Sequence, residues 1–253
     1  MTSLRDDELD RYARHIILKE IGGAGQLKLR VSRVAVIGAG GLGSPCIQYL
    51  AAAGLGQLTV IDDDTVALSN LQRQVLHGTD DLGRAKVASA ADAVARLNPD
   101  VEFNGARVRL TRENATALLA GHDVIADGSD SFETRLAVAD TALALRIPLV
   151  SAAVGPFEGQ IATFRGWQPD LPCYRCFVGA ATDVAGETCA DQGIIGALAG
   201  VIGACQALEV IREITGFGTS LAGRLLLYDA LAARMRTLNL AKDPGCPTCG
   251  TPA

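Results

Sequence analysis

The chain has 253 residues, and 49% of them are hydrophobic, which is enough to bury the core of one large domain or two small ones. Its formal net charge of -5 argues against a general nucleic-acid or membrane-surface role, because both need basic surface. The acidic, polar start does not resemble a targeting peptide. Glycines interrupt the apolar run over residues 194–208, so we interpret this run as a buried helix rather than a membrane span. We therefore expect a cytoplasmic protein.

Predicted helices and strands alternate through the first half of the chain. Residues 6–20 carry apolar side chains at helical spacing behind acidic residues, which favours a helix. A β-branched strand over residues 33–37 enters a glycine-rich loop, and a helix with Pro45 in its first turn follows and ends near Gly54. The next elements are predicted as strands over 58–61, 101–108, 123–126 and 148–152 and as helices over 81–97, 113–120 and 132–145.

This alternation predicts an α/β fold. Strands that alternate with helices form right-handed βαβ crossovers, which give a Rossmann-like parallel sheet with helices on both faces. From Gly159 onward, short strands are separated by a cysteine-containing loop and an apolar helix, and we expect them to extend the same sheet in antiparallel fashion. We expect one domain over residues 1–253, with an N-terminal helical segment (1–30), a nucleotide-binding half (31–155) and a second half (156–253). The late elements are strands at 161–164, 224–228 and 235–238 and the helix near 194–214.

A glycine fingerprint lies between the first strand and its helix. In such a loop the first glycine makes a tight turn, the second lets the backbone approach a phosphate, and the third lets the helix pack closely. The phosphate then meets the free N–H groups of the helix N-terminus. Asp62 ends the second strand about 20 residues on, where a carboxylate can accept the ribose hydroxyls. The sequence therefore predicts a nucleotide site, with the glycines Gly38, Gly40, Gly41 and Gly43.

Two cations downstream favour the cleavage of a triphosphate over hydride transfer. Arg73 can clamp phosphate oxygens in a bidentate fork, and Lys86 supplies a movable point charge where negative charge builds on leaving pyrophosphate. Asp130 follows the fourth strand at the edge where open α/β sheets bind ligands, and it is placed to hold Mg²⁺. Taken singly, the cations could be solvated surface charges and Asp130 the N-cap of the next helix.

Four cysteines are spaced as two CxxC pairs. Two such pairs supply four thiolates, the donor set of a tetrahedral structural Zn²⁺ site, whereas a single pair could be a redox pair. A metal here would tie the end of the chain to its middle. Cys46 and Cys205 fall in predicted buried helices and are interpreted as core residues. The predicted zinc ligands are Cys173, Cys176, Cys246 and Cys249.

Together these features resemble the ThiF/MoeB/HesA family, the bacterial relatives of ubiquitin-activating enzymes. The similarity runs from Arg11 to Cys249, and the stretch Ser-Asn-Leu-Gln-Arg-Gln at residues 69–74 is far more specific than the glycines. The family uses MgATP to adenylate the C-terminal carboxylate of a small ubiquitin-like protein and releases pyrophosphate. Three short stretches, at 64–66, 76–77 and 228–230, look most like its molybdopterin-synthase branch, with the thiazole-pathway branch close behind.

The resemblance implies roles for particular residues. Asn70, Arg73 and Lys86 would contact the phosphates and Asp130 the magnesium, with Ser69 beside them. Arg14 would reach the ATP site of the partner subunit in a homodimer. Two further positions stand out, namely Ser131, where the family usually has an asparagine, and Cys189, which in some branches bonds the carrier protein.

The resulting hypothesis is an adenylyltransferase for a sulfur-carrier protein of the molybdopterin-synthase or thiazole type. No general base is needed, because the attacking carboxylate is already ionised at neutral pH. Sulfur would come from a separate donor, because no rhodanese domain follows Cys249. An NAD-dependent oxidoreductase would share the glycine loop but leave the cations and cysteine pairs unexplained. A module that holds a nucleotide without turnover is the other alternative.

Overall fold

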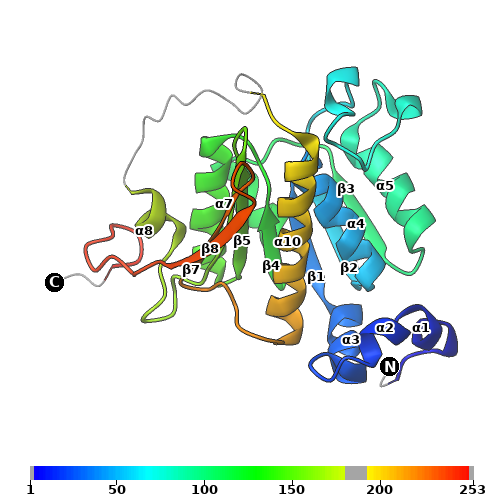
Figure 1. Cartoon of the computed structure of the whole chain (residues 1–253), viewed down its shortest axis with the longest axis horizontal. Coiled ribbons are helices and arrows are strands. Elements are labelled where there is room, and N and C mark those ends of the chain that lie inside the picture. The colour runs from blue at the N-terminus through cyan, green and yellow to red at the C-terminus, as the bar shows by residue number, and fades with distance from the viewer. Residues whose placement is uncertain (1–2, 180–192, 251–253) are drawn as a thin grey trace.

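An eight-stranded mixed sheet forms the centre of the protein, in the order β3-β2-β1-β4-β5-β6-β7-β8 (Figure 1). The computed structural model describes residues 3–179 and 193–250. Strands β3 to β5 pair in parallel and the pairings from β5 to β8 are antiparallel, as the sequence predicts. The strands are β1 (Arg33–Ile37), β2 (Gln57–Ile61), β3 (Glu102–Ala106), β4 (Val124–Asp127), β5 (Leu149–Val154), β6 (Glu158–Phe164), β7 (Arg224–Asp229) and β8 (Arg234–Asn239).

Helices cover both faces of the sheet. One face carries α3, α4, α5 and α10 over a core that includes Leu50, Leu58 and Ile202, and the other carries α6, α7 and α8 over a core that includes Ile125 and Leu149. Figure 1 shows α10 in front of the strands, beside α4. The helices are α1 (Asp6–Arg11), α2 (Ala13–Ile16), α3 (Gly22–Val31), α4 (Gly43–Ala53), α5 (Lys86–Leu97), α6 (Arg112–Leu119), α7 (Phe132–Leu145), α8 (Tyr174–Val178) and α10 (Gly196–Thr215), with 3₁₀ turns η1 (Leu68–Asn70) and η2 (Thr79–Asp81).

The strand order reverses between β1 and β4, and this reversal positions the site. The chain moves outward from β1 to β2 and β3, and then returns to place β4 and β5 on the other side of β1. Open α/β sheets bind ligands at the carboxyl ends of the strands that flank such a reversal. Here those ends carry the glycine loop after β1 and residues 128–131 after β4.

The N-terminal segment differs from the single helix predicted over residues 6–20. Two short helices separate at Tyr12, whose side chain is buried, and no helix continues past Ile16 until α3. Glycines at 22, 23 and 25 hid α3 from sequence analysis, because glycine lowers helix propensity by about 1 kcal/mol. Contacts of α3 with α10 and with the core through Leu29 outweigh that cost.

Helix α5 begins five residues later than predicted, and this places Lys86 at its first position. Gly83 takes φ +79°, a left-handed conformation that ends the preceding turn, and Ala85 pairs with Thr65 in an isolated bridge. The apolar helix predicted near 194–214 is α10, which buries Leu198 and Ile202. In the described part of the chain, no helix is both long enough and apolar enough to cross a membrane.

Candidate functional site

The glycine loop forms a tight turn directly before the N-terminus of α4. Gly38 takes φ +88°, which only glycine adopts without strain, and its N–H donates to the Ile61 carbonyl of the adjacent strand at 2.9 Å. A Cβ on Gly43 would overlap the carbonyl oxygen of Gly38, so the third glycine of the fingerprint is a steric necessity. The loop therefore has the shape in which backbone N–H groups at a helix start face an anion.

Asp62 holds the backbone of this loop. Its Oδ2 accepts the N–H of Ala39 at 2.7 Å, and its Oδ1 accepts the N–H of Asp64 at 2.9 Å. The side chain is partly exposed at the carboxyl end of β2. The structure therefore brings Asp62 to the glycine loop, where it also organises the backbone.

The stretch over residues 69–74 packs directly over the glycines. The aliphatic part of Arg73 covers Gly41, at 3.6 Å from where a Cβ would stand, and Gln74 faces Gly40 at 3.7 Å. The Arg73 guanidinium donates to the carbonyl of Ser69 in its own turn at 3.0 Å. Asn70 caps η1 by accepting the N–H of Ala67 at 3.2 Å. This turn thus brings a cation beside the loop.

Lys86 is a buried cation at the start of α5. Its side chain is 6% exposed and its Nζ lies 2.7 Å from the Oδ2 of Asp64, whose side chain is 66% exposed. The backbone N–H of Lys86 also donates to the Asp64 carbonyl at 3.0 Å. A buried ammonium costs free energy unless an anion pairs with it. Because the Asp64 side chain is mostly in solvent, a bound phosphate can replace it as the partner of Lys86.

Residues 127–131 close the other side of the loop. A Cβ on Gly38 would lie 3.5 Å from the carbonyl oxygen of Gly128, so the two turns lie against each other. Ser131 caps α7 by accepting the N–H of Thr134, which removes the alternative in which Asp130 is the cap. Asp130 is exposed in the turn that follows β4.

Buried polar atoms without a protein partner surround these turns. In the described part of the chain they include Oγ of Ser44 on the first turn of α4, Oε1 of Gln74 and Oδ2 of Asp127. Buried polar groups in native proteins are almost always hydrogen-bonded, to protein, water or ligand. Their location around the glycine loop fits a polar ligand there. Sequence analysis named Gln74 only as the end of the 69–74 stretch and gave it no role, and no local pattern indicated the burial of Asp127.

Arg14 lies at the opposite edge of the sheet. Tyr12, two residues before Arg14, packs on Gly54, and the Tyr12 hydroxyl accepts a hydrogen bond from Asn98 at 2.8 Å. Gly54 precedes β2 and Asn98 precedes β3, so this contact marks the amino ends of these strands. The length of a five-residue strand, roughly 16 Å, separates that edge from the glycine loop. Figure 1 shows α2 below the sheet, away from that loop. The exposed Arg14 therefore cannot serve the nucleotide site of its own chain.

The four predicted zinc ligands form one cluster. Their Sγ atoms all lie within 4.8 Å of one another, with separations of 3.8 Å (Cys173–Cys176), 3.6 Å (Cys173–Cys246) and 3.4 Å (Cys176–Cys249). A zinc–sulfur bond of about 2.3 Å in a tetrahedron sets sulfur atoms about 3.8 Å apart. The cluster therefore fits a structural Zn²⁺ that joins α8 to the segment after β8.

The remaining cysteines do not belong to this cluster. Burial raises the pKa of Cys46 to about 12, and Cys46 is a fully buried core residue as predicted. Cys205 is only partly buried on α10, less than the sequence suggests. Cys189 lies outside the described residues. Within the cluster, burial raises the pKa of Cys246. Hydrogen bonds from the backbone N–H groups of Thr248 and Cys249 lower it by more, so the pKa of Cys246 falls to about 7.

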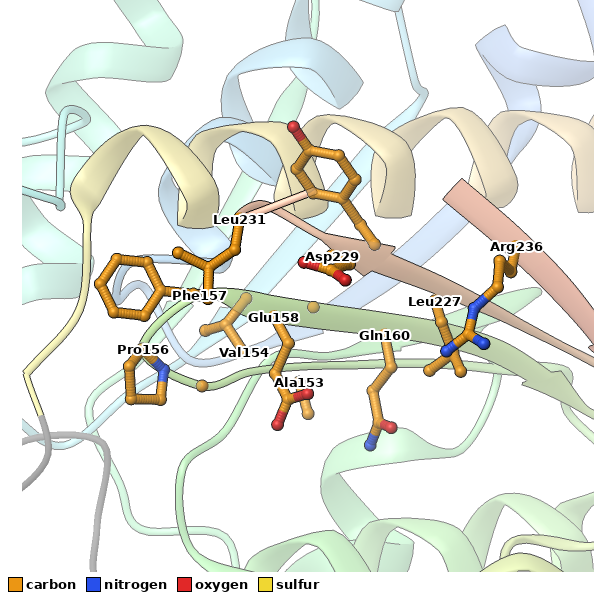
Figure 2. Close-up of a pocket in the computed structure, with 13 residues that line it drawn as sticks. Ala153, Val154, Pro156, Phe157, Glu158, Gln160, Leu227, Asp229, Leu231 and Arg236 are labelled. Carbon is orange, nitrogen blue, oxygen red and sulfur yellow. The ribbon is translucent and has the colours of Figure 1, made fainter. Parts of the chain in front are cut away.

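A cavity of about 660 Å³ lies along the same edge of the sheet, two strands beyond the glycine loop. The β5–β6 turn and the β7–β8 turn form its walls, and Figure 2 shows Pro156, Phe157 and Leu231 at one end and Arg236 at the other. Gln160 and Leu227 are register partners in its floor. Sequence analysis did not find this cavity, because two strand pairs about 60 residues apart in the chain, β5–β6 and β7–β8, build it together.

Two histidines, the buried His77 and the partly buried His122, have lowered pKa values. Burial lowers the pKa of His77, and the nearby Lys86 lowers it further. The hydrogen bond with the Ala39 carbonyl and the charges of Asp81 and Asp62 only partly compensate. Burial lowers the pKa of His122 in the same way, with Arg33 lowering and Asp123 raising it.

These two lowered pKa values predict an acid-dependent loss of stability. Above pH of about 6.5 both histidines are neutral in either state, so they contribute no pH dependence. As the pH falls below that value, the unfolded chain binds protons that the folded chain resists, and the free energy of unfolding decreases until the lowered pKa is passed. Denaturant titrations between pH 7 and pH 5 should therefore show less pH dependence for the variant His122→Gln than for the unaltered chain. Identical slopes would contradict this.

The ThiF family model matches residues 12–248. The chain is 47% identical over 249 residues to the SAMP-activating enzyme E1 of Haloferax volcanii, covering 98% of this chain and 91% of that one. It is 45% identical to the sulfur carrier protein adenylyltransferase of Thermus thermophilus (96% and 92% covered) and 42% identical to the molybdopterin-synthase adenylyltransferase of Escherichia coli (99% and 100%). A crystal structure of E. coli MccB with MccA-N7isoASN shares the fold, with a TM-score of 0.85, 20% identity and 95% and 75% coverage.

Proposed function

This chain belongs to the ThiF family, and from that membership we propose that it is an adenylyltransferase acting on a small ubiquitin-like sulfur-carrier protein. It would use MgATP to adenylate the carrier's C-terminal carboxylate, in the cytoplasm and in molybdenum-cofactor or thiamine biosynthesis. Relatives named as adenylyltransferases, at 45% and 42% identity over nearly the whole chain, support this proposal.

One structural observation carries the proposal, namely a pair of cations: Arg73, which packs on Gly41, and the buried Lys86, which pairs with Asp64 just after β2. An NAD-dependent oxidoreductase needs that loop and an acidic residue such as Asp62, but it has no step in which charge builds on a leaving pyrophosphate. Adenylation has such a step, and cations fixed in a site of low dielectric stabilise it strongly. The two cations therefore favour a site that cleaves ATP.

The chemistry needs binding and charge stabilisation from the protein rather than a base. An oxygen of the carrier carboxylate forms a bond to the α-phosphorus of ATP as the bond from that phosphorus to the pyrophosphate oxygen breaks. The carboxylate is already ionised, so no proton moves. The loop N–H groups bind phosphate. Arg73 offsets the negative charge on the leaving pyrophosphate, and so does Lys86 once the phosphate has replaced Asp64 as its partner. Asp130 would hold Mg²⁺, which neutralises phosphate charge when bound.

The cavity between the β5–β6 and β7–β8 turns fits the carrier. Its open, partly apolar end at Phe157 and Leu231 suits an extended C-terminal tail, and the carboxyl end of β5 leads from the cavity toward Asp127 and the glycine loop. The 44% exposed Phe157 and the 77% exposed Leu231 suit contact with a protein surface.

The cysteine cluster would hold zinc in a structural role. Four thiolates complete the coordination, so no position remains for a substrate. Arg175, which lies between two of the ligands, forms two hydrogen bonds of 2.8 Å with Asp140 on α7. The cluster is thereby fixed to the helix that follows Asp130.

A homodimer would bring Arg14 to a nucleotide site. The outer face of α10 leaves Val201 and Leu208 exposed, and Tyr49 on the adjacent α4 is 58% exposed. A face of this kind on two neighbouring helices suits a self-complementary interface. Arg14, too far from its own glycine loop, could then act on the site of the second copy.

Mixing two inactive variants tests this arrangement. We expect Arg14→Ala and Lys86→Ala to be inactive as homodimers, because each removes a cation from every site. Random exchange of subunits gives half heterodimers, each with one intact site, so activity should recover to about one quarter of the unaltered level. Assays of adenylation before and after subunit exchange measure this. A mixture that stays inactive while the subunits demonstrably exchange places Arg14 outside the partner's site.

Exchange of radiolabelled pyrophosphate into ATP tests the proposed reaction itself. We expect exchange only when a carrier protein with an intact C-terminus is present, because the adenylate forms on that carboxylate. A carrier lacking its last residues is the control. Tight binding of NADH together with no exchange for any carrier would favour the oxidoreductase instead.

A further inference from the structure

His77, which is 6% exposed, contacts the glycine loop directly through the backbone of Ala39. Its Nε2 lies 3.0 Å from the carbonyl oxygen of Ala39, and its Nδ1 lies 2.8 Å from Oγ of Ser89 on α5. Both ring nitrogens are therefore engaged, one with the loop and one with a helix. The reaction scheme above assigns His77 no role.

Chemistry determines the tautomer of this ring. A carbonyl oxygen only accepts hydrogen bonds, so the Nε2 of His77 must carry the proton and donate to Ala39. In the neutral ring Nδ1 then has a free lone pair that faces the Ser89 hydroxyl, and this hydroxyl also hydrogen-bonds the Asp81 carboxylate. Burial and the nearby Lys86 lower the pKa of His77, which favours the neutral ring that this arrangement requires. Ser89 thus anchors the ring through the nitrogen that does not face the loop.

Ala39 is the residue of the loop with the most to gain from such a contact. It stands between Gly38 and Gly40, and glycine loses more conformational freedom on folding than any other residue type. Its N–H is bound by Asp62 and its C=O by His77, so both peptide groups next to Ala39 have fixed orientations. Those orientations set the direction of the neighbouring N–H groups.

Three side chains from a single turn cover three consecutive loop residues. Arg73 packs on Gly41, Gln74 faces Gly40, and His77 binds the carbonyl between Gly38 and Gly40. The turn over residues 73–77 therefore contacts the loop as a unit, and its one direct hydrogen bond to the loop backbone is that of His77.

We propose that His77 is a positioning residue for nucleotide binding, which holds the Ala39 carbonyl so that the loop N–H groups point at the phosphates. The inference rests on the nucleotide site of the proposed function but not on which molecule is adenylated. A structural histidine that merely fills the core would affect stability without a separate effect on nucleotide affinity.

The test compares three variants and a matched control in the full chain, with calorimetric titration of MgATP and thermal unfolding as readouts. His77→Leu keeps volume and removes both hydrogen bonds, whereas His77→Gln places an amide N–H near the position of Nε2. Ser89→Ala keeps the His77 side chain but removes the hydrogen-bond partner that anchors its Nδ1. The control is His122→Leu, since the partly buried His122 ring also uses both nitrogens, with the Leu119 carbonyl and the Thr59 hydroxyl.

We expect His77→Leu to raise the Kd for MgATP about tenfold, the value of one good hydrogen bond. Ser89→Ala should raise it about threefold, and His77→Gln should restore it to within about threefold of the unaltered chain. His122→Leu should lower the Tm with no change in Kd. If His77→Leu does not fold, Ser89→Ala and His77→Gln still decide the question.

Two results distinguish failure of this inference from failure of the proposed function. If the unaltered chain binds MgATP but His77→Leu and Ser89→Ala bind it with unchanged Kd, His77 is a core residue and the inference is wrong. If the unaltered chain does not bind MgATP, the proposed function is wrong and the inference with it. An equal Kd increase in His122→Leu also overturns the inference, because the effect is then general destabilisation.

Discussion

Replacing Lys86 by alanine is expected to reduce carrier-dependent pyrophosphate exchange about 100-fold to 1,000-fold, the usual cost of removing one fixed donor from a developing negative charge. The ammonium is 6% exposed, so its field on a bound phosphate is little screened by water. Its only described ion-pair partner, Asp64, is an exposed side chain that a phosphate can displace. The KM for MgATP should change less than kcat, because the charge grows in the transition state.

Lys28→Ala is the matched control for this prediction. The Nζ of Lys28 lies 3.1 Å from the carbonyl of Thr215, at the end of α10 away from the glycine loop. This variant should keep full exchange activity. Exchange in Lys86→Ala above about one third of the unaltered rate would contradict the assignment of Lys86 to the leaving pyrophosphate.

Replacing Cys246 by serine is expected to remove zinc and to lower the Tm by about 6 to 12 °C. Metal binding contributes directly to folding free energy, and losing about 3 kcal/mol of it shifts the Tm of a chain this size by that amount. The cluster joins the segment after β8 to α8, so its loss frees both segments from each other. Metal analysis should fall from one zinc per chain to near zero.

Cys205→Ser provides the comparison, because Cys205 is a partly buried cysteine outside the cluster. It should retain one zinc per chain. The zinc assignment is wrong if Cys246→Ser retains its metal, or if the unaltered chain purified with zinc present contains none.

Most of the sheet could be predicted from sequence because its signals are local. The β-branched run over residues 33–37 and the glycines after it determine a strand, a turn and a helix start within a dozen residues. The CxxC spacing likewise predicts a four-thiolate set, although the structure was needed to bring Cys173 and Cys246 to 3.6 Å.

The parts that escaped prediction depend on contacts between distant residues. His77 binds residues 12 and 38 positions away, so no local pattern marks it. The cavity near Phe157 depends on the register of β5 to β8. Helix α3 forms despite its glycines because tertiary packing outweighs low helix propensity.

Mass spectrometry of each candidate carrier, after incubation with MgATP and this protein, tests the central claim most directly. We predict that one carrier gains the mass of a single AMP group at its C-terminus, and that Lys86→Ala abolishes the gain. A separate covalent adduct between carrier and enzyme would report on Cys189. No mass gain for any molybdopterin-synthase-type or thiazole-type carrier, with an enzyme that binds MgATP, would contradict the account.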